Sequence, residues 1–373
     1  MAKLGEVCKV SPSTKNIKRQ SAWLLNLDMV EQQTGRVIEY KYAGEDDLNG
    51  SIIQFDTENV LYSKLRPNLN KVVLPEKDGF STSELLPLRP DASVLNRDYL
   101  AVFLRSDSFV TWAVSKTAGA KMPRLGTKDL MNAEIPVPNI ERQKEIAEKF
   151  KKLEQLISLR KQQLAKLDEL VKARFVEMFG DISNSRKVPM QDVCKIITDG
   201  THQPPKFVLS GIPFLFVSNI VTNEIHYDAE KFISEETYNE LIKRTPIEVG
   251  DVLLSTVGSY GHPAVVKENK PFCFQRHIAY LKPNNSVVNS EYLRCAILST
   301  DLQRQIDESV KGIAQKTLNL SEIRKLRLPL PSLSLQNQFA AFVERVDQQK
   351  QTVQQSLEKL ELMKKALMQE YFG

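Results

Sequence analysis

The sequence MPRLGTKDLMNAEIPVPNIERQKEIAEKF at residues 122–150 has a counterpart later in the chain, QKTLNLSEIRKLRLPLPSLSLQNQFAAFV at residues 315–343. The two stretches align at a constant offset of 193 residues, and the two prolines of IPVP fall on the two prolines of LPLP. Because self-similarity at a fixed offset marks repeated structural units, the chain is predicted to contain two copies of one architecture.

Further matches extend the duplication in both directions at the same or a slightly smaller offset. The matched pairs are Asp98–Leu100 with Glu291–Leu293, Phe179–Gly180 with Phe372–Gly373, Val60–Ser63 with Val252–Ser255, and Val7–Lys9 with Val193–Lys195. Identity is low, but an ordered series of matches over half the chain supports a duplication.

In each copy the two prolines precede a long helical pattern. A proline cannot lie inside a helix, so Pro136 and Pro138 place the helix start near Ile140 or Glu141, and the helix is predicted to run to Phe179. About 40 residues at 1.5 Å per residue give a rod of roughly 60 Å. Apolar residues recur at alternating steps of four and three. They are Ile146, Phe150, Leu153, Ile157, Leu164, Leu167, Val171 and Met178, and then Phe339, Val343, Val346, Val353, Leu357, Leu360, Leu367 and Tyr371.

A narrow apolar seam on so long a rod needs an equally long partner. One possibility is that each helix packs against its own globular part. Because the chain contains two helices of equal length and phase, we predict that they pair with each other as a coiled coil.

The rest of each copy is rich in short β-branched and aromatic runs, such as VLYSKL, FLFVSNI and HIAYLK, which glycine, proline and asparagine separate. This pattern is typical of strands and turns, and helices are expected near 98–116 and 290–309. The predicted fold class is therefore α+β. The predicted domain limits are 1–134 and 181–327 for two strand-rich domains, and 135–180 and 328–373 for the two helices.

The composition, 42% hydrophobic and 26% charged, is that of an ordinary globular protein. With neither an apolar run of 18 residues nor a leader-like N-terminus, we expect a cytoplasmic protein without membrane association. The four cysteines show no metal-binding spacing, so we expect neither disulfides nor a zinc site. The net charge of +5 is compatible with a polyanionic partner.

Motifs for catalysis are weak or missing. The sequence has no GxxxxGK[ST] or GxGxxG loop and no Asn/Asp-Pro-Pro-aromatic loop of an adenine methyltransferase. Glu268 with Asp251 is the nearest approach to a nuclease site, but we interpret Glu268–Lys270 as a charged turn. Ser255, His262 and Asp251 could form a triad, yet the apolar strand around Ser255 favours a structural serine. We expect a chain that is not an enzyme.

Loops rich in hydrogen-bond donors, which lie between apolar strands, are the remaining candidates for a binding site. Arg and Asn side chains match the edges of DNA bases, and Lys neutralises phosphates. In the first copy they lie in LYSKLRPNLNKVVL at 61–74 and AGAKMPRLG at 118–126. The candidates there are Ser63, Lys64, Arg66, Asn68, Asn70, Lys71, Lys121 and Arg124. In the second copy they are Thr201, His202, Gln203, Ser218, Asn219, Ser259, Tyr260, His262, Arg276, His277, Gln315 and Lys316.

Over essentially its whole length the sequence resembles the specificity (S) subunit of type I DNA restriction-modification systems. The resemblance rests on LYSKLRPNLNKVVL followed by TSELLPLRP, and on DGTHQPP and GDVLLSTVGSYGHPAVV in the second copy. The most specific feature is the duplicated proline-proline-glutamine start of the two helices, IPVPNIERQKEIA and LPLPSLSLQNQFA.

The resemblance implies two pseudo-twofold-related target recognition domains, joined by two long antiparallel helices, with each domain reading one half of a split site on double-stranded DNA. It also implies two modification subunits, which methylate adenine with S-adenosylmethionine, and restriction subunits that use ATP and magnesium. No cofactor is expected on this chain itself. The two recognition halves share little beyond their framework, as in a family member that reads two different half-sites.

Two other functions fit parts of the pattern. A structural adaptor would use the coiled coil to scaffold other proteins without binding DNA, and salt-sensitive retention on duplex DNA separates it from a DNA reader. A recognition module fused to a nuclease would need a catalytic domain, for which the chain has no room left.

Overall fold

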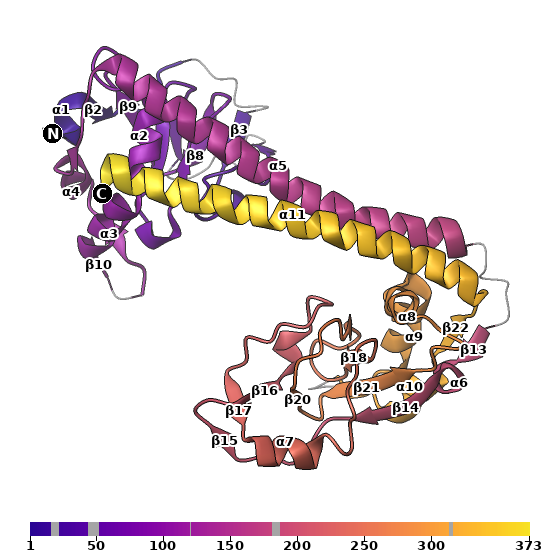
Figure 1. The fold of residues 1–373 in the computed structure, drawn as a ribbon. Coiled ribbons are helices and arrows are strands. Elements are labelled where there is room, and N and C mark those ends of the chain that lie inside the picture. Colours follow the sequence, from indigo (N-terminus) through magenta and orange to yellow (C-terminus); the bar gives the residue numbers. More distant parts are fainter. Residues whose placement is uncertain (16–21, 44–51, 120, 181–186, 313–315) are drawn as a thin grey trace. The chain divides into compact units, whose positions relative to one another are not determined.

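A computed structural model describes residues 1–15, 22–43, 52–119, 121–180, 187–312 and 316–373 (Figure 1). The chain divides into two compact units, which are Met1–Gln162 with Gln354–Gly373, and Gln163–Val353. Each unit combines helices with small, mostly antiparallel sheets, which confirms the α+β class. The finer limits drawn from the sequence, at 134, 180 and 327, stay a prediction.

The strands of the first unit form two four-stranded sheets, with the orders β2-β9-β6-β7 and β4-β3-β8-β5, and two short pairs, β1-β12 and β10-β11. The strands are β1 (Ala2–Lys3), β2 (Cys8–Val10), β3 (Ala22–Leu25), β4 (Lys41–Ala43), β5 (Ile52–Phe55), β6 (Val60–Ser63), β7 (Val72–Val73), β8 (Gly79–Thr82), β9 (Leu85–Pro90), β10 (Thr117–Ala118), β11 (Arg124–Leu125) and β12 (Glu134–Ile135). The helices are α1 (Leu4–Val7), α2 (Arg97–Leu104), α3 (Asp107–Ser115), α4 (Thr127–Met131), the first part of α5 (Ile140–Phe179) and the last part of α11 (Leu333–Phe372).

The second unit has the four-stranded sheets β14-β21-β18-β19 and β15-β17-β16-β20, and the pair β13-β22. The strands are β13 (Lys187–Pro189), β14 (Cys194–Asp199), β15 (Phe207–Val208), β16 (Ile212–Leu215), β17 (Lys231–Ile233), β18 (Val252–Ser255), β19 (Pro263–Val265), β20 (Cys273–Phe274), β21 (Ile278–Pro283) and β22 (Arg327–Pro329). The helices are the last part of α5, α6 (Met190–Val193), α7 (Glu235–Leu241), α8 (Ser290–Ile297), α9 (Thr300–Ser309), α10 (Leu320–Lys325) and the first part of α11 (Leu333–Phe372).

We call the sheets β2-β9-β6-β7 and β14-β21-β18-β19 the central sheets, and they confirm the predicted duplication. Strand β6 pairs antiparallel with β9 in the first unit, and β18 pairs antiparallel with β21 in the second. The paired residues at the strand ends are Val60 with Leu88 and Ser63 with Leu85, and Val252 with Leu281 and Ser255 with Ile278. The register is therefore the same in both copies.

Strand β6 is buried on both faces, which explains its unbroken apolar sequence. Val60 and Tyr62 pack into the core that contains the helices, whereas Leu61 packs into a second core under the other sheet. This follows from the alternation of side chains along a strand. Strand β18 divides its side chains between two cores in the same way.

The segments expected to be helical near 98–116 and 290–309 each form two helices rather than one. In the first unit, α2 ends before Ser106, whose hydroxyl accepts a hydrogen bond from the N–H of Phe109 and caps α3 (3.3 Å). Ser299 caps α9 in the same way. A serine at this position accepts a hydrogen bond from a free N–H in the first turn of the second helix. It therefore favours the end of one helix and the start of another.

The long helices begin after their prolines, as predicted, and each has 40 residues. A buried glutamine fixes the start of each helix. The Oε1 atom of Gln143 accepts from the N–H of Asn96 (2.8 Å), and its Nε2 donates to the carbonyls of Val94 and Pro138 (2.8 and 2.7 Å). The second unit repeats these bonds with Gln336, Asn289, Val287 and Pro331. The proline-proline-glutamine motif thus attaches each helix to its domain.

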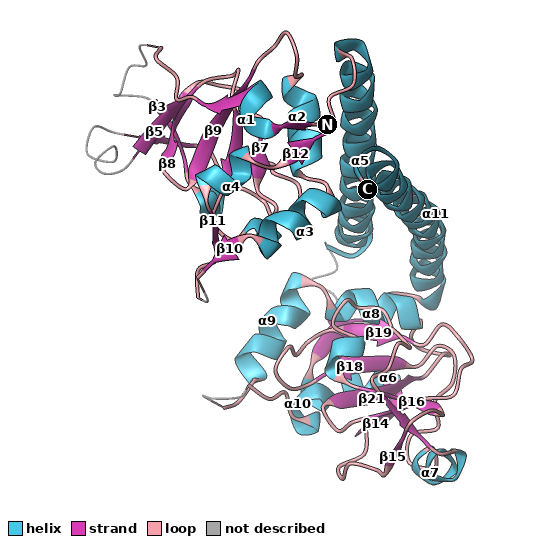
Figure 2. Ribbon diagram, turned by 90° about the vertical axis from the view of Figure 1, so that its left-hand side faces the viewer, coloured by secondary structure: helices cyan, strands magenta, loops and turns pink. Residues whose placement is uncertain are grey.

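Helix α2 lies between the central sheet and the long helices in the first unit (Figure 2). Its Tyr99 donates to the carbonyl of Pro136 (2.8 Å), and the Tyr99 ring packs 5.4 Å from the ring of Phe372. In the second unit, Tyr292 of α8 donates to the carbonyl of Pro329 (2.6 Å).

Within each unit the two long helices pair with each other, as the coiled-coil prediction expects, and they run antiparallel, as the resemblance implies. In the first unit, Lys364 contacts Glu154 (2.9 Å) and Glu361 contacts Lys161 (3.1 Å). In the second unit, Lys350 contacts Asp168 (2.8 Å), and the Phe175 and Phe339 rings lie 5.5 Å apart. Among the described helices, none is long and apolar enough to cross a membrane.

Candidate nucleic-acid interface

Loops at one end of the central sheet meet in the first unit. Directly after β6, the N–H of Lys64 donates to the carbonyl of Glu84 (3.1 Å), and the carbonyl of Lys64 accepts from the N–H of Leu125 (2.9 Å). The N–H of Arg66 donates to the carbonyl of Pro123 (2.8 Å). These bonds join two polar clusters that lie far apart in the sequence, which we call the first loop surface (residues 63–71 and 121–125).

The second unit has the same backbone framework at the corresponding positions. The N–H of Thr256 donates to the carbonyl of His277 (2.9 Å), and the carbonyl of Thr256 accepts from the N–H of Leu318 (2.8 Å). The N–H of Gly258 donates to the carbonyl of Lys316 (3.3 Å). Three equivalent bonds therefore hold equivalent loops in the two copies.

One more loop joins this framework in the second unit. The N–H of Thr201 donates to the carbonyl of Phe274 (3.1 Å), and the N–H of Arg276 donates to the carbonyl of Thr201 (3.0 Å). The loop after β14 therefore lies beside the turn before β21. We call residues 199–203, 256–262, 275–277 and 316–318 together the second loop surface; Gln315, a predicted member, lies outside the described residues.

The first loop surface presents a group of cations. Among the predicted residues, Arg66, Asn68, Lys121 and Arg124 are exposed and Lys64 is half-buried. Arg66 has a φ of +49°, a left-handed conformation that is uncommon for a residue with a side chain. One acid lies among them, because Glu84 accepts from Nη2 of Arg124 (3.0 Å).

Three predicted residues of this surface are engaged with the backbone instead. Ser63 is buried and donates from Oγ to a carbonyl two residues on (2.9 Å). Asn70 is buried and donates to the carbonyl of Arg105 (3.0 Å), while Lys71 donates to the carbonyl of Leu27 (2.5 Å). Desolvation by burial lowers the pKa of Lys71. These residues shape the loop, and the exposed ones form its outer face.

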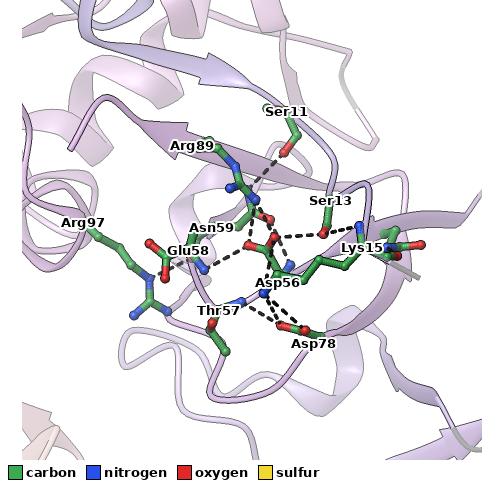
Figure 3. Close-up of polar contacts among 11 residues, drawn as sticks. Ser11, Ser13, Lys15, Asp56, Thr57, Glu58, Asn59, Asp78, Arg89 and Arg97 are labelled. Atoms are coloured by element: carbon green, nitrogen blue, oxygen red, sulfur yellow. Dashed lines mark hydrogen bonds and ion pairs between the residues drawn. The ribbon is translucent and has the colours of Figure 1, made fainter. Parts of the chain in front are cut away.

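A buried carboxylate anchors the other end of β6 (Figure 3). Both oxygens of Asp56 accept from Nη2 of Arg89 (2.7 and 2.6 Å), and Oδ2 also accepts from Oγ of Ser13 (2.8 Å). Burial by itself raises the pKa of Asp56, but hydrogen bonds from Arg89, Ser13 and the Glu58 N–H outweigh it and hold the pKa below its usual value.

Replacing Asp56 by Asn should lower the free energy of unfolding at pH 7 by about 2–3 kcal/mol, because the guanidinium of Arg89 loses its buried counter-ion. A depressed pKa in the fold stabilises the protein above the pKa of the unfolded chain, about 3.9, and the stabilisation is lost as the pH falls through the folded value. The difference between wild type and Asp56→Asn should therefore shrink below about pH 4.

Urea unfolding between about pH 7 and pH 3 measures this difference. The control is Glu76→Gln, which removes an exposed charge from the same unit and should leave the unfolding curve unchanged. A difference that stays constant down to pH 3 would show that the ionised Asp56 contributes nothing.

The second loop surface has fewer cations and more neutral donors. Its exposed predicted residues are His202, Gln203, Ser259, Arg276 and Lys316, and its half-buried ones are Thr201, Tyr260, His262 and His277. Two contacts order its side chains, since Tyr260 donates to Asp307 (3.0 Å) and Nζ of Lys316 lies 6.0 Å above the Tyr260 ring. Burial, together with the neighbouring Arg276, lowers the pKa of His277, which favours its neutral form.

Ser218 and Asn219 lie in a short 3-10 helix, Val217–Asn219, at the start of a neighbouring loop. Ser218 is exposed, whereas Asn219 is buried and donates to the carbonyls of His226 and Asp228 (3.0 and 3.1 Å). Asn219 therefore holds its own loop together. The loop is connected to the second loop surface through His262, whose Nδ1 lies 3.3 Å from Oδ1 of Asn223.

The residues considered for catalysis have structural partners. The Ser255 hydroxyl accepts from the backbone N–H of His262 (2.9 Å), and Asp251 is buried and accepts from Tyr280 (2.8 Å), so these three side chains do not form a triad. Glu268 pairs with Lys270 (2.6 Å), as expected of a charged turn. Within the described part of the chain, no group of three or more His, Cys, Asp or Glu residues could hold a metal ion.

Two residues outside the predicted set also contact these surfaces. Glu84 contacts Arg124 in the first unit, and in the second unit Arg244 contacts both Asp199 (2.5 Å) and His202 (3.5 Å). Asp199 begins the DGTHQPP motif, but nothing in the sequence around Arg244 connects it with that motif.

Comparison with known proteins agrees with this architecture. The family model for the type I restriction modification DNA specificity domain matches residues 1–169 and 183–362, once in each copy. A type I restriction enzyme EcoBI specificity subunit from Escherichia coli is 23% identical over 262 residues, covering 62% of this chain and 55% of that protein. The MjaVIII specificity subunit from Methanocaldococcus jannaschii is 20% identical over 323 residues, covering 81% and 75%.

Two solved structures have the same fold. The S subunit of a type I restriction-modification system from M. genitalium superposes with a TM-score of 0.63 at 15% identity, covering 100% of this chain and 95% of that one. A chain from a study of complex assembly and conformational transition of the type I R-M system has a TM-score of 0.56 at 18% identity, covering 100% and 96%. The match to the EcoBI subunit spans about half of that relative's length.

Proposed function

Since this chain belongs to the type I restriction modification DNA specificity family, we propose that it is a DNA-recognition subunit that reads a bipartite site on double-stranded DNA. The proposal rests on one observation above all. The same three backbone hydrogen bonds present different polar side chains in the two units. A common framework with different side chains is what reading two different half-sites requires.

The chemistry of the two surfaces supports different contributions to binding. Arg66, Lys121 and Arg124 on the first loop surface suit contacts to phosphates, and the arginines also suit paired bonds to a guanine. The second loop surface offers His202, Gln203 and other neutral donors and acceptors, which suit base edges. Phosphate contacts would give affinity and register, and base contacts would give sequence preference.

We further propose that this chain does no chemistry itself. Two modification subunits would supply S-adenosylmethionine and methylate adenine, and restriction subunits would supply the ATP- and magnesium-dependent activity. The relatives' names as specificity subunits support this division of labour. The chain's contribution would then be to place the partner subunits on a chosen sequence.

The test is selection of DNA by the full, purified chain from a pool of duplexes with randomised base pairs. We expect two enriched motifs and a dissociation constant that rises steeply with salt, because cations on the protein release counter-ions from phosphates. The same preparation, incubated with S-adenosylmethionine, ATP, magnesium and duplex DNA, should neither methylate nor cleave. Binding that is weak, salt-insensitive and without preference would favour the adaptor function, and turnover in pure material would contradict a non-catalytic chain.

A further inference from the structure

A cluster of three side chains lies at the end of strand β14. Asp199 is the last residue of the strand, and its side chain is 14% exposed. Its Oδ1 accepts from Nη2 of Arg244 (2.5 Å), and its Oδ2 lies 3.0 Å from Nε2 of His202. A largely buried carboxylate thus holds two side chains that are themselves about half exposed, Arg244 at 52% and His202 at 53%.

Asp199 and His202 belong to the second loop surface, and Arg244 contacts it through them. Asp199 lines one cavity of about 400 Å³ together with Arg276 and His277. The residue after Asp199, Gly200, donates from its N–H to the carbonyl of Ile278 at the start of β21 (3.2 Å). Arg244 comes from a different part of the chain, the segment after α7, and reaches this place only through the fold.

The contacts of Arg244 leave part of its guanidinium open. Asp199 and His202 both contact Nη2, and among the described residues no hydrogen bond to Nε or Nη1 occurs. Every parallel pair of N–H donors in a guanidinium of this kind includes Nη2, together with Nε or Nη1. Asp199 accepts from one N–H of Nη2, and Nε2 of His202 must itself donate to the Asp199 carboxylate, so the second N–H of Nη2 stays open beside its neighbour. Such a pair of donors in one plane matches O6 and N7 of a guanine. Fixing the side chain before binding also reduces the conformational entropy that is lost in the complex.

We propose that Arg244 is a specificity-determining residue of the second unit, which reads a guanine in the major groove, and that Asp199 is the residue that positions it. The proposal rests on the proposed function, because it assumes that the second loop surface faces DNA. An ion pair that served only to hold α7 against the sheet would not need an arginine that is half exposed and has open donors.

The experiment compares variants of the full chain in selection from a randomised duplex pool. Arg244→Ala should lose the preference for guanine at one base pair of one motif by about tenfold or more, and leave the other motif unchanged. Arg244→Lys should lose it as well, since an ammonium lacks the paired donors. Asp199→Asn should weaken the preference at the same base pair, because the guanidinium is no longer held.

The matched control is Lys243→Ala, which removes the same charge from the adjacent exposed position. It should lower affinity for all sequences alike without changing either motif. If Arg244→Ala behaves as Lys243→Ala does, while wild type still selects two motifs, Arg244 is a phosphate contact or a structural residue and the proposal is wrong. If wild type selects no motif, the proposed function itself fails. Circular dichroism confirms that each variant is folded.

Discussion

Exchanging residues 1–134 for the matching region of another family member should replace one half of the recognised sequence and leave the other half unchanged. The two units have separate cores, and the candidate surfaces are built from loops within each unit. Each mismatched base pair costs about 1–3 kcal/mol, so the preference for the original half-site should fall by roughly a hundredfold or more. Selection from a randomised duplex pool reports both halves in one measurement.

The junction of such a chimera has to preserve the contacts between domain and helix. Tyr99 and Phe103 pack against Phe372, and Tyr99 also donates a hydrogen bond to the carbonyl of Pro136. The family member that supplies the new domain must therefore have aromatic residues at the positions of Tyr99 and Phe103. In a second chimera the exchange extends through Gln143 instead of ending at residue 134. The residues at positions 96 and 143 then come from the same protein, so the hydrogen bond between them is kept. A change in both halves of the site, seen in both chimeras, would mean that the two units read DNA jointly.

The architecture could be predicted from the sequence because its determinants are local or periodic. The prolines before each helix exclude helix at their own positions, and apolar residues at alternating steps of four and three require a helical partner. The duplication adds information that one copy lacks, since matching residues such as Gln143 and Gln336 turn out to make the same buried bonds. The sequence pattern does not separate α2 from α3, because the turn between the two helices depends on a single residue, the serine that caps α3.

The candidate surfaces were predicted less completely, for a physical reason. A polar residue in a loop can face solvent or satisfy a buried backbone group, and the sequence pattern is the same in both cases. Asn68 and Asn70 illustrate this, because the first is exposed and the second binds the carbonyl of Arg105. Arg244 could not be associated with Asp199 at all, since 45 residues separate them and only the packing of the second unit brings them together.

The largest loss of affinity should follow from removing the cations of the first loop surface. The variant changes Lys64, Arg66, Lys121 and Arg124 to Gln, which keeps long polar side chains and removes four positive charges. If each contacts a phosphate, the slope of log K against log salt should become shallower by up to about 3.6, at 0.9 per contact. The same relation gives a loss of roughly 10³-fold in affinity at 0.15 M salt, for specific and non-specific sequences alike.

A matched variant separates this effect from a general change in charge. Changing the exposed Lys144, Lys149, Lys151 and Lys152 of α5 to Gln removes the same charge from the same unit, on a helix rather than on the loops. If the loops face DNA, this control should keep nearly the full salt slope, because charges beyond a Debye length of about 8 Å from the phosphates are screened. Equal losses in the two variants would mean that net charge alone drives binding. A larger loss in the helix variant would place the DNA against α5, and the first loop surface would then need another function.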